Sequence, residues 1–559
     1  MNSRFFSLGV GLVASALLVT GCRVPPSGGN PPGSKPASDS VIARQAQAHA
    51  HYAQAVLLEA GGRKPEAQEE YHLAAQLDPA NEELVTQVAR RWLLQSKPDR
   101  AIEILKLGAD QPGATAIMDV LLGTAYAQAG ETDLADAANR RAVRKSPLLL
   151  AGHQNLYASR LQEGKNEAAV AVLDTAAKAR KPDAEYLIGL AELYLNFSTA
   201  VPSGKTNAVP KAQALLERAL SAGVTNIHER IRLAEALNAV GESDQAAELY
   251  QGILMDFPQA PMLQETVRAK LTDIYLRDQD AKRALEQIEV ILRNDPTNIR
   301  AHYLAAAILS DENQPQKAEQ HLRKVVVLSP KFEQAYYDLA MSQLRTDNTN
   351  DIFQTLEAAQ KKFGQNFISE FLLALANARV DRLDEAVERF TSAEIIGRAS
   401  DTNRLTAMFY HQFGATLERK GDYTEAVKCL EKSLELDSNF APSANHLGYM
   451  WAERGENLER ARELIARALR VEPESDAYLD SMAWVLFKLG KPREALPFML
   501  QAVRLAGQAG TPDATLFDHL GDVHAALGDD ATARQAWIEA LKLKPDPEIQ
   551  KKLDNAKGD

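Results

Sequence analysis

The chain has 559 residues, of which 45% are apolar and 25% are charged, an ordinary composition for a folded protein. Its formal net charge is −12 and no cluster of Lys and Arg is evident, so a nucleic-acid partner is not expected, because acidic surfaces repel phosphates. Only two cysteines are present, Cys22 and Cys429. A disulfide framework is therefore excluded, and packing must hold the fold together.

The first 21 residues have the features of a signal sequence. Residues 5–21 carry no charged side chain, and this run is shorter than the roughly 20 apolar residues of a membrane-spanning helix. The segment Val19-Thr20-Gly21-Cys22 resembles the lipobox of bacterial lipoproteins. The resemblance implies cleavage before Cys22 and lipidation of its thiol. Arg23 follows in place of an aspartate, which implies an outer-membrane protein facing the periplasm. A plain signal peptide and an uncleaved anchor are the alternatives.

Residues 22–41 are predicted to be a tether. They contain five prolines and three glycines, and they have too little apolar surface to offset the entropy lost on ordering. Fully extended, such a segment spans at most about 50–60 Å. We expect it to space a folded part of the chain away from a membrane.

A 34-residue period organises the remaining chain. The eighth residue of each period is Gly or Ala in twelve of fourteen copies, for example Gly123 and Gly521. The twentieth residue, allowing for insertions, is Ala in every copy except the ninth, which has Ile352. The predicted repeats start at residues 48, 82, 116, 150, 184, 227, 265, 299, 333, 367, 407, 441, 476 and 514.

This pattern resembles the tetratricopeptide repeat (TPR), a pair of antiparallel helices. The resemblance implies an all-α fold, a right-handed superhelix of about fourteen repeats over residues 42–547, with a short capping helix in residues 548–559. Small residues at positions 8 and 20 would let the two helices of a repeat approach closely, and each pair would bury its apolar face by stacking on its neighbours.

Four insertions interrupt the period and are predicted to be longer loops, at residues 198–209, 259–264, 397–406 and 506–513. Repeat nine lacks its turn glycine and has Thr346-Asp-Asn-Thr-Asn350 instead. A joint between two halves is expected either there or at Gly397.

The family resemblance places ligand-facing side chains at positions 2, 5, 6, 9, 12 and 13 of each first helix. Two candidate surfaces follow. The aromatic ladder comprises Tyr303, Tyr337, Met341, Phe371 and Leu375. The C-terminal cluster comprises Asn445, Tyr449, Asp480, Trp484, His519 and Asp522. Trp484 is expected to be exposed in the free protein, and the carboxylates to favour a basic or amide-rich partner segment. The alternative is that these aromatic residues only pack against neighbouring helices.

No enzyme, cofactor or metal site is predicted. Ser203-Gly-Lys-Thr206 imitates the end of a phosphate loop, but Thr199 stands where that loop needs glycine. His49 and His51 are two residues apart on an expected helix and face different directions. Cys429 is interpreted as a small packing residue.

The function expected from the sequence is protein binding, as an adaptor or assembly scaffold with protein or peptide partners on the concave face and a membrane contact through the lipid. By resemblance, such a lipoprotein recruits a periplasmic protease or a wall hydrolase to its target. The alternatives are an assembly factor for a secretion, pilus or polysaccharide-export machine and, less favoured, a cell-wall or glycan enzyme. The sequence leaves open whether the solenoid forms a homo-oligomer.

Overall fold

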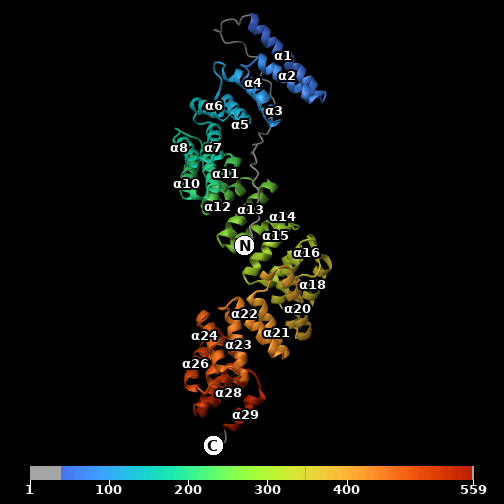
Figure 1. Ribbon diagram of the computed structural model, residues 1–559, viewed down its shortest axis with the longest axis vertical. Coiled ribbons are helices and arrows are strands. Elements are labelled where there is room, and N and C mark those ends of the chain that lie inside the picture. Colours follow the sequence, from blue (N-terminus) through green and yellow to red (C-terminus); the bar gives the residue numbers. More distant parts are fainter. Residues whose placement is uncertain (1–38, 347, 557–559) are drawn as a thin grey trace. The chain divides into compact units, whose positions relative to one another are not determined.

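The computed structural model describes residues 39–346 and 348–556, so Cys22, the predicted signal sequence and residues 22–38 of the predicted tether lie outside the described ranges. Within those ranges the chain forms 29 α-helices and two short 3-10 helices, η1 (Pro202–Gly204) and η2 (Thr402–Arg404), with no strand (Figure 1). The predicted all-α fold is confirmed. No helix in this part of the chain is both long and apolar enough to cross a membrane.

The chain divides into two compact units, which separate between Ile253 and Leu254. This differs from the joint expected at residues 346–350 or at Gly397, because Ile352 and Leu405 are buried and tie both of those regions into the second unit. The helices that begin in the first unit are α1 (Asp39–Ala60), α2 (Lys64–Leu77), α3 (Glu82–Leu94), α4 (Pro98–Ala109), α5 (Ala116–Gln128), α6 (Thr132–Lys145), α7 (Leu150–Gln162), α8 (Asn166–Ala176), α9 (Ala184–Ala200), α10 (Lys205–Ala222), α11 (Ile227–Val240) and α12 (Ser243–Asp256).

The second unit contains the remaining seventeen α-helices of the described chain and η2. They are α13 (Pro261–Arg277), α14 (Ala281–Asn294), α15 (Ile299–Asp311), α16 (Pro315–Leu328), α17 (Glu333–Arg345), α18 (Thr349–Phe363), α19 (Phe367–Arg379), α20 (Leu383–Ser400), α21 (Ala407–Lys420), α22 (Tyr423–Leu436), α23 (Ala441–Arg454), α24 (Leu458–Val471), α25 (Asp476–Lys488), α26 (Pro492–Ala509), α27 (Ala514–Ala526), α28 (Asp530–Leu543) and α29 (Pro547–Asn555).

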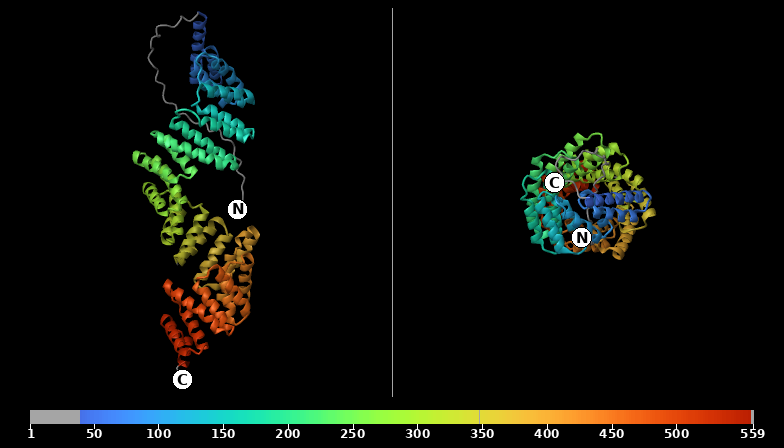
Figure 2. Two further views of the ribbon diagram at one scale, coloured as in Figure 1. Left: turned by 90° about the vertical axis from the view of Figure 1, so that its left-hand side faces the viewer. Right: turned by 90° about the horizontal axis from the view of Figure 1, so that it is seen from above.

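Consecutive helices pair as hairpins, and within each unit one hairpin packs on the next (Figure 2). Most first helices begin at the residue predicted as a repeat start, for example Glu82 for α3 and Asp476 for α25. Two begin earlier: α1 starts at Asp39, inside the predicted tether, and α13 starts at Pro261 instead of residue 265. Proline suits the first turn of a helix, because its missing N–H would have no partner there.

Glycine at the eighth position allows close helix contact. A Cβ atom on Gly448 would lie 2.6 Å from Cγ1 of Ile465 and 2.9 Å from the carbonyl oxygen of Ala461. Only glycine therefore lets α23 and α24 pack at their observed separation. Gly421 serves instead to end a helix. It follows the last residue of α21 with φ of 88°, a left-handed conformation that glycine adopts without strain.

The predicted loop insertions are largely helical, which corrects the sequence interpretation. Extra residues lengthen α9 to Ala200, α20 to Ser400 and α26 to Ala509, and α10 already begins at Lys205. The inserted helical segments bury apolar side chains, among them Ala208 and Ala506. Burial of these side chains stabilises the added turns, so most of the inserted residues continue the hairpins.

Candidate partner-binding surfaces

Both candidate surfaces lie on first helices of the second unit. The aromatic ladder is carried by α15, α17 and α19, and the C-terminal cluster by α23, α25 and α27. Helical periodicity places positions 5 and 9 on one face of each first helix, so the two groups occupy the same face of their respective hairpins.

The two ladder tyrosines use their hydroxyl groups within the chain. Tyr303 donates a hydrogen bond of 2.6 Å to Oδ2 of Asp338. Tyr337 donates to Oε1 of Glu333 at 2.7 Å and accepts from Nδ2 of Asn366 at 2.6 Å. Burial is the main cause that raises the pKa of Tyr303 and of Tyr337 to about 12. Tyr337 is only 4% exposed, so its side chain is not accessible to a partner.

Phe371 and Leu375 are half-buried and also serve packing. The ring of Phe371 lies 5.9 Å from that of Phe367, 6.0 Å from that of Phe390 and 5.6 Å from that of Phe409. Leu375 packs at the edge of the same apolar core. The aromatic ladder is therefore not one continuous exposed surface.

Tyr303 and Met341 nevertheless meet at a pocket, which we call the α15–α17 pocket. It has a volume of about 230 Å³, and Met341 is 41% exposed at its edge. Arg345 borders the pocket and donates to the carbonyl oxygen of Ser310 at 3.2 Å. Its full lining is Tyr303, Ala306, Ala307, Ser310, Asp311, Leu322, Asp338, Met341, Ser342 and Arg345.

Trp484, at the centre of the C-terminal cluster, is buried, and the expectation of an exposed indole is wrong. The side chain is 6% exposed. Its ring stacks on His519 with centroids 3.8 Å apart and on Phe487 with centroids 5.0 Å apart, at interplanar angles of 13° in both cases. The ammonium group of Lys488 lies 4.6 Å from the indole centroid. Neighbours on its own and on the following first helix thus cover the indole.

The carboxylates of the C-terminal cluster already have partners in the chain. Asp480 contacts Nδ1 of the buried His519 at 2.9 Å. Asp522 accepts from Nε1 of Trp537 at 3.2 Å and from Nζ of Lys552, on α29, at 2.7 Å. A basic or amide-rich partner segment would have to displace these contacts, and the expectation that the carboxylates favour such a segment stays a prediction.

Two buried polar atoms of the C-terminal cluster have no hydrogen-bond partner among the described residues. They are Nε1 of Trp484 and Oδ1 of Asn445. Tyr449 is half-buried, and its ring lies 6.4 Å from that of His519. The C-terminal cluster is therefore a closed cluster between adjacent first helices, and its residues remain only predicted partner contacts.

Sequence reasoning missed a regular connection between adjacent repeats. The residue at position 5 of one first helix bonds to the residue at position 6 of the next, as in Tyr303 with Asp338 and Asp480 with His519. Asp518 repeats the arrangement with Lys552, whose Nζ lies 2.8 Å from Oδ1. Complementary side chains separated by one repeat plus one residue are the signal that would have identified these pairs.

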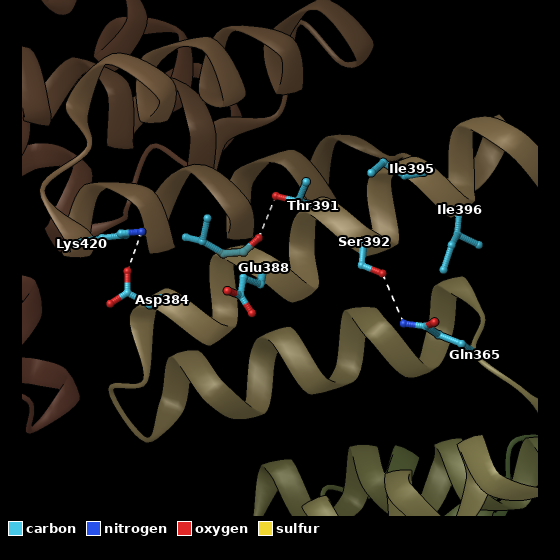
Figure 3. Close-up of a pocket in the computed structure, with 9 residues that line it drawn as sticks. Gln365, Asp384, Glu388, Thr391, Ser392, Ile395, Ile396 and Lys420 are labelled. Carbon is cyan, nitrogen blue, oxygen red and sulfur yellow. Dashed lines mark hydrogen bonds and ion pairs between the residues drawn. The ribbon is translucent and has the colours of Figure 1, made fainter.

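Sequence reasoning also missed an open groove on a second helix. The groove has a volume of about 490 Å³ and follows one face of α20, where Ile395 is exposed (Figure 3). Lys420 pairs with Asp384 at 2.6 Å at one end, and Gln365 donates to Oγ of Ser392 at 3.5 Å. No predicted partner residue lines it, because the predictions were confined to first helices.

The described chain contains no group of three or more His, Cys, Asp or Glu side chains placed to hold a metal ion. Cys429 is the only cysteine in these ranges, and burial raises the pKa of its thiol to about 12. Thiolate is the nucleophilic form of cysteine, so this side chain is unsuited to nucleophilic chemistry.

His411 on α21 gives a pH-dependent prediction. Burial, with a smaller effect of His446, lowers the pKa of His411 from 6.5 to about 4, and its Nδ1 lies 3.1 Å from Oγ of Ser443. The unfolded chain binds a proton that the folded chain does not bind between these pKa values. The free energy of unfolding should therefore fall as pH decreases from about 6.5 to about 4. His411→Gln should reduce this slope in denaturant titrations of the second unit, and a slope equal to that of the parent would contradict the assignment.

Stacked helical hairpins joined by short turns define a class of repeat proteins that present extended binding surfaces. A family profile described as tetratricopeptide repeat matches residues 367–439, and a second matches residues 412–480 and 481–548. Residues 367–548 thus contain tetratricopeptide repeats. Proteins built from these repeats generally act as protein-binding adaptors or scaffolds.

Similarity to individual proteins is partial. A TPR repeat-containing protein of Pseudomonas aeruginosa is 32% identical over 105 residues, which are 19% of this chain and 17% of the relative's length. Photosystem I assembly protein Ycf3 of Synechococcus sp. is 26% identical over 144 residues, which are 25% of this chain and 68% of the relative. A chain in the crystal structure of the APC/C hetero-tetramer Cut9–Hcn1 is 15% identical, with 85% of this chain and 96% of that chain covered and a TM-score of 0.40.

Proposed function

We propose that this protein is an adaptor or assembly scaffold that holds a partner protein by a side chain inserted into the α15–α17 pocket. The observation that carries the proposal is the pocket itself, in which a hydrogen-bonded tyrosine of α15 and an exposed methionine of α17 flank two alanines of α15. Ligand pockets for small molecules usually have about 300–1,000 Å³, so a volume of about 230 Å³ suits one side chain better than a whole metabolite.

Four of the ten lining residues are apolar, and they would receive an apolar anchor. Ala306, Ala307 and Leu322 supply the walls, while Met341 adjusts its shape because its unbranched side chain has several rotatable bonds. Tyr303 and Asp338 are fixed by their mutual hydrogen bond and leave a polar edge. An aliphatic or aromatic side chain flanked by polar groups in the partner would match this arrangement.

Replacing Met341 tests the pocket. We expect Met341→Glu to weaken partner binding by about 2 kcal/mol or more, roughly thirtyfold, because a carboxylate at the pocket edge loses its water when the partner binds. Stability should change little, because the side chain is exposed. A photoreactive residue at position 341 would identify the partner by crosslinking, and the affinity of that partner for the variants would then be measured.

Met255→Glu is the matched control, since Met255 is an exposed methionine outside this pocket. Equal binding by the parent and both variants would exclude the α15–α17 pocket as the partner site. In that case the C-terminal cluster and the α20 groove would be tested by the same crosslinking approach.

We also propose that the chain is lipid-anchored at Cys22 in the outer membrane and faces the periplasm. The lipobox-like segment and the predicted tether support this. Cys22→Ser is expected to abolish acylation and release the protein from outer-membrane fractions, which mass spectrometry and fractionation would detect. A variant that is processed normally and withstands high-salt and carbonate washing in the membrane fraction would refute the anchor.

Within this role, the protein would bring a periplasmic protease or wall hydrolase to its target. The similarity to the Synechococcus photosystem I assembly protein favours assembly of a larger complex as the second candidate. A secretion, pilus or polysaccharide-export machine would be such a complex. The identity of the crosslinked partner distinguishes the two roles.

A further inference from the structure

Two short basic segments of the first unit contradict the expectation that the chain has no basic cluster. Residues 140–145 contain four Lys or Arg residues, and residues 178–181 contain three. The first segment ends α6 and the second follows α8. They belong to adjacent repeats, so they occupy equivalent places in neighbouring hairpins.

A tyrosine hydroxyl shows that the two helix ends lie together. Tyr186 on α9 donates to the carbonyl oxygen of Ala176 at 2.9 Å and lies 3.4 Å from the carbonyl oxygen of Pro147. Ala176 is the last residue of α8, and Pro147 follows the end of α6 by two residues. One hydroxyl group thus bridges both ends, and the basic segments share one edge of the first unit (α6 and α8 are labelled in Figure 1).

Part of this charge is neutralised locally. Arg141 contacts Oδ1 of the buried Asp119 at 2.9 Å, and Lys145 contacts its Oδ2 at 2.8 Å. Asp174 on α8 is held by Nζ of Lys211 at 2.6 Å, although it remains within electrostatic reach of Lys178. These two carboxylates are therefore already paired with cations outside the set considered below.

Four exposed cations on this edge have side chains with no ion pair or hydrogen bond to any described residue, and we call them the basic edge. They are Arg144, Lys178, Arg180 and Lys181. Three of them lie beyond the end of α8, so they exceed the one or two cations that a helix C-terminus favours through its dipole. The first unit is also less acidic than the second. Residues 1–253 hold 25 basic and 27 acidic side chains, whereas residues 254–559 hold 38 basic and 48 acidic side chains.

We propose that the basic edge contacts an anionic phospholipid surface, which would be a second membrane contact beside the lipid at Cys22. This inference rests on the proposed lipid anchor, which would hold the first unit close to headgroups and raise their effective concentration. Juxtamembrane Lys and Arg side chains are attracted to anionic headgroups and gain roughly 1 kcal/mol each, about fivefold in binding. The four cations of the basic edge present this chemistry on one edge of the first unit.

Vesicle binding by the unacylated protein tests the basic edge without the anchor. The probe is the full mature chain carrying Cys22→Ser, sedimented with vesicles of phosphatidylcholine alone or mixed with phosphatidylglycerol. We expect binding to the anionic vesicles only, with loss at high salt because screening shortens the reach of the charges. Neutralising all four cations should weaken binding at least tenfold; the changes are Arg144→Gln, Lys178→Gln, Arg180→Gln and Lys181→Gln.

A matched variant neutralises four exposed lysines of the second unit and should bind like the parent; its changes are Lys317→Gln, Lys324→Gln, Lys331→Gln and Lys361→Gln. Equal losses in both variants, no binding to anionic vesicles by the parent, or tighter binding to a DNA duplex than to the vesicles would overturn the proposal. Acylation of the parent is measured separately by mass spectrometry, so failure of the basic edge and failure of the anchor are distinguishable.

Discussion

Trp484→Ala is expected to destabilise the second unit by about 3–5 kcal/mol, because truncation of a buried tryptophan removes its packing and leaves a cavity. The indole is 6% exposed and lies between His519 and Phe487. Denaturant titration followed by circular dichroism would measure the loss. Hydrogen exchange should place it in α23 to α27, since solenoid repeats contact mainly their neighbours.

Trp484→Phe provides the comparison, because a smaller aromatic ring keeps part of the stack and should cost less. Met341→Ala serves as the exposed control and should change stability by well under 1 kcal/mol. If Trp484→Ala cost less than about 1 kcal/mol while it greatly weakened partner binding, the indole would be a binding residue instead of a packing residue.

The second large effect concerns Glu370, a buried carboxylate on α19. Nη1 of Arg389 lies 3.2 Å from both of its oxygens, and Nε2 of Gln360 donates to Oε1 at 2.6 Å. Arg389→Met would leave the charge without its guanidinium partner. Breaking a fully buried pair costs about 3–5 kcal/mol. Because Arg389 is 40% exposed and partly screened by water, we expect about 2–3 kcal/mol.

Combining Arg389→Met with Glu370→Gln should restore more than half of that loss, because a neutral amide needs no counter-ion. Denaturant titrations of the two single variants, the double variant and the parent form a double-mutant cycle. A double variant whose loss equals the sum of the single losses would show that the two side chains are not coupled.

The helices could be predicted because the residues that determine them recur at fixed positions within each 34-residue period. A small residue at position 8 and alanine at position 20 recur, and they correctly indicate where paired helices touch, as Gly448 against Ile465 illustrates. The insertions could not be resolved in this way, because a loop and a helix extension differ in whether side chains such as Ala208 and Ala506 find a packing surface. That surface belongs to other helices.

The candidate surfaces were predicted less well than the fold. Periodicity predicted that Tyr303 and Met341 lie on the same face of adjacent first helices, and both line the α15–α17 pocket. It could not reveal that Trp484 is covered, because the covering ring of His519 comes from the next first helix, 35 residues later. Exposure along a first helix depends on the adjacent repeat, so a register position alone does not distinguish a binding residue from a packing residue.

The bonds between positions 5 and 6 also have a mechanical consequence. Tyr303 to Asp338, Asp480 to His519 and Asp518 to Lys552 each join neighbouring first helices of the second unit. Bending that unit so that its first helices separate would lengthen these contacts. Under tension the unit would resist extension until these hydrogen bonds and ion pairs break, and it would extend more easily afterwards. Its extensibility would thus be set by a few polar contacts on one side of the hairpin stack.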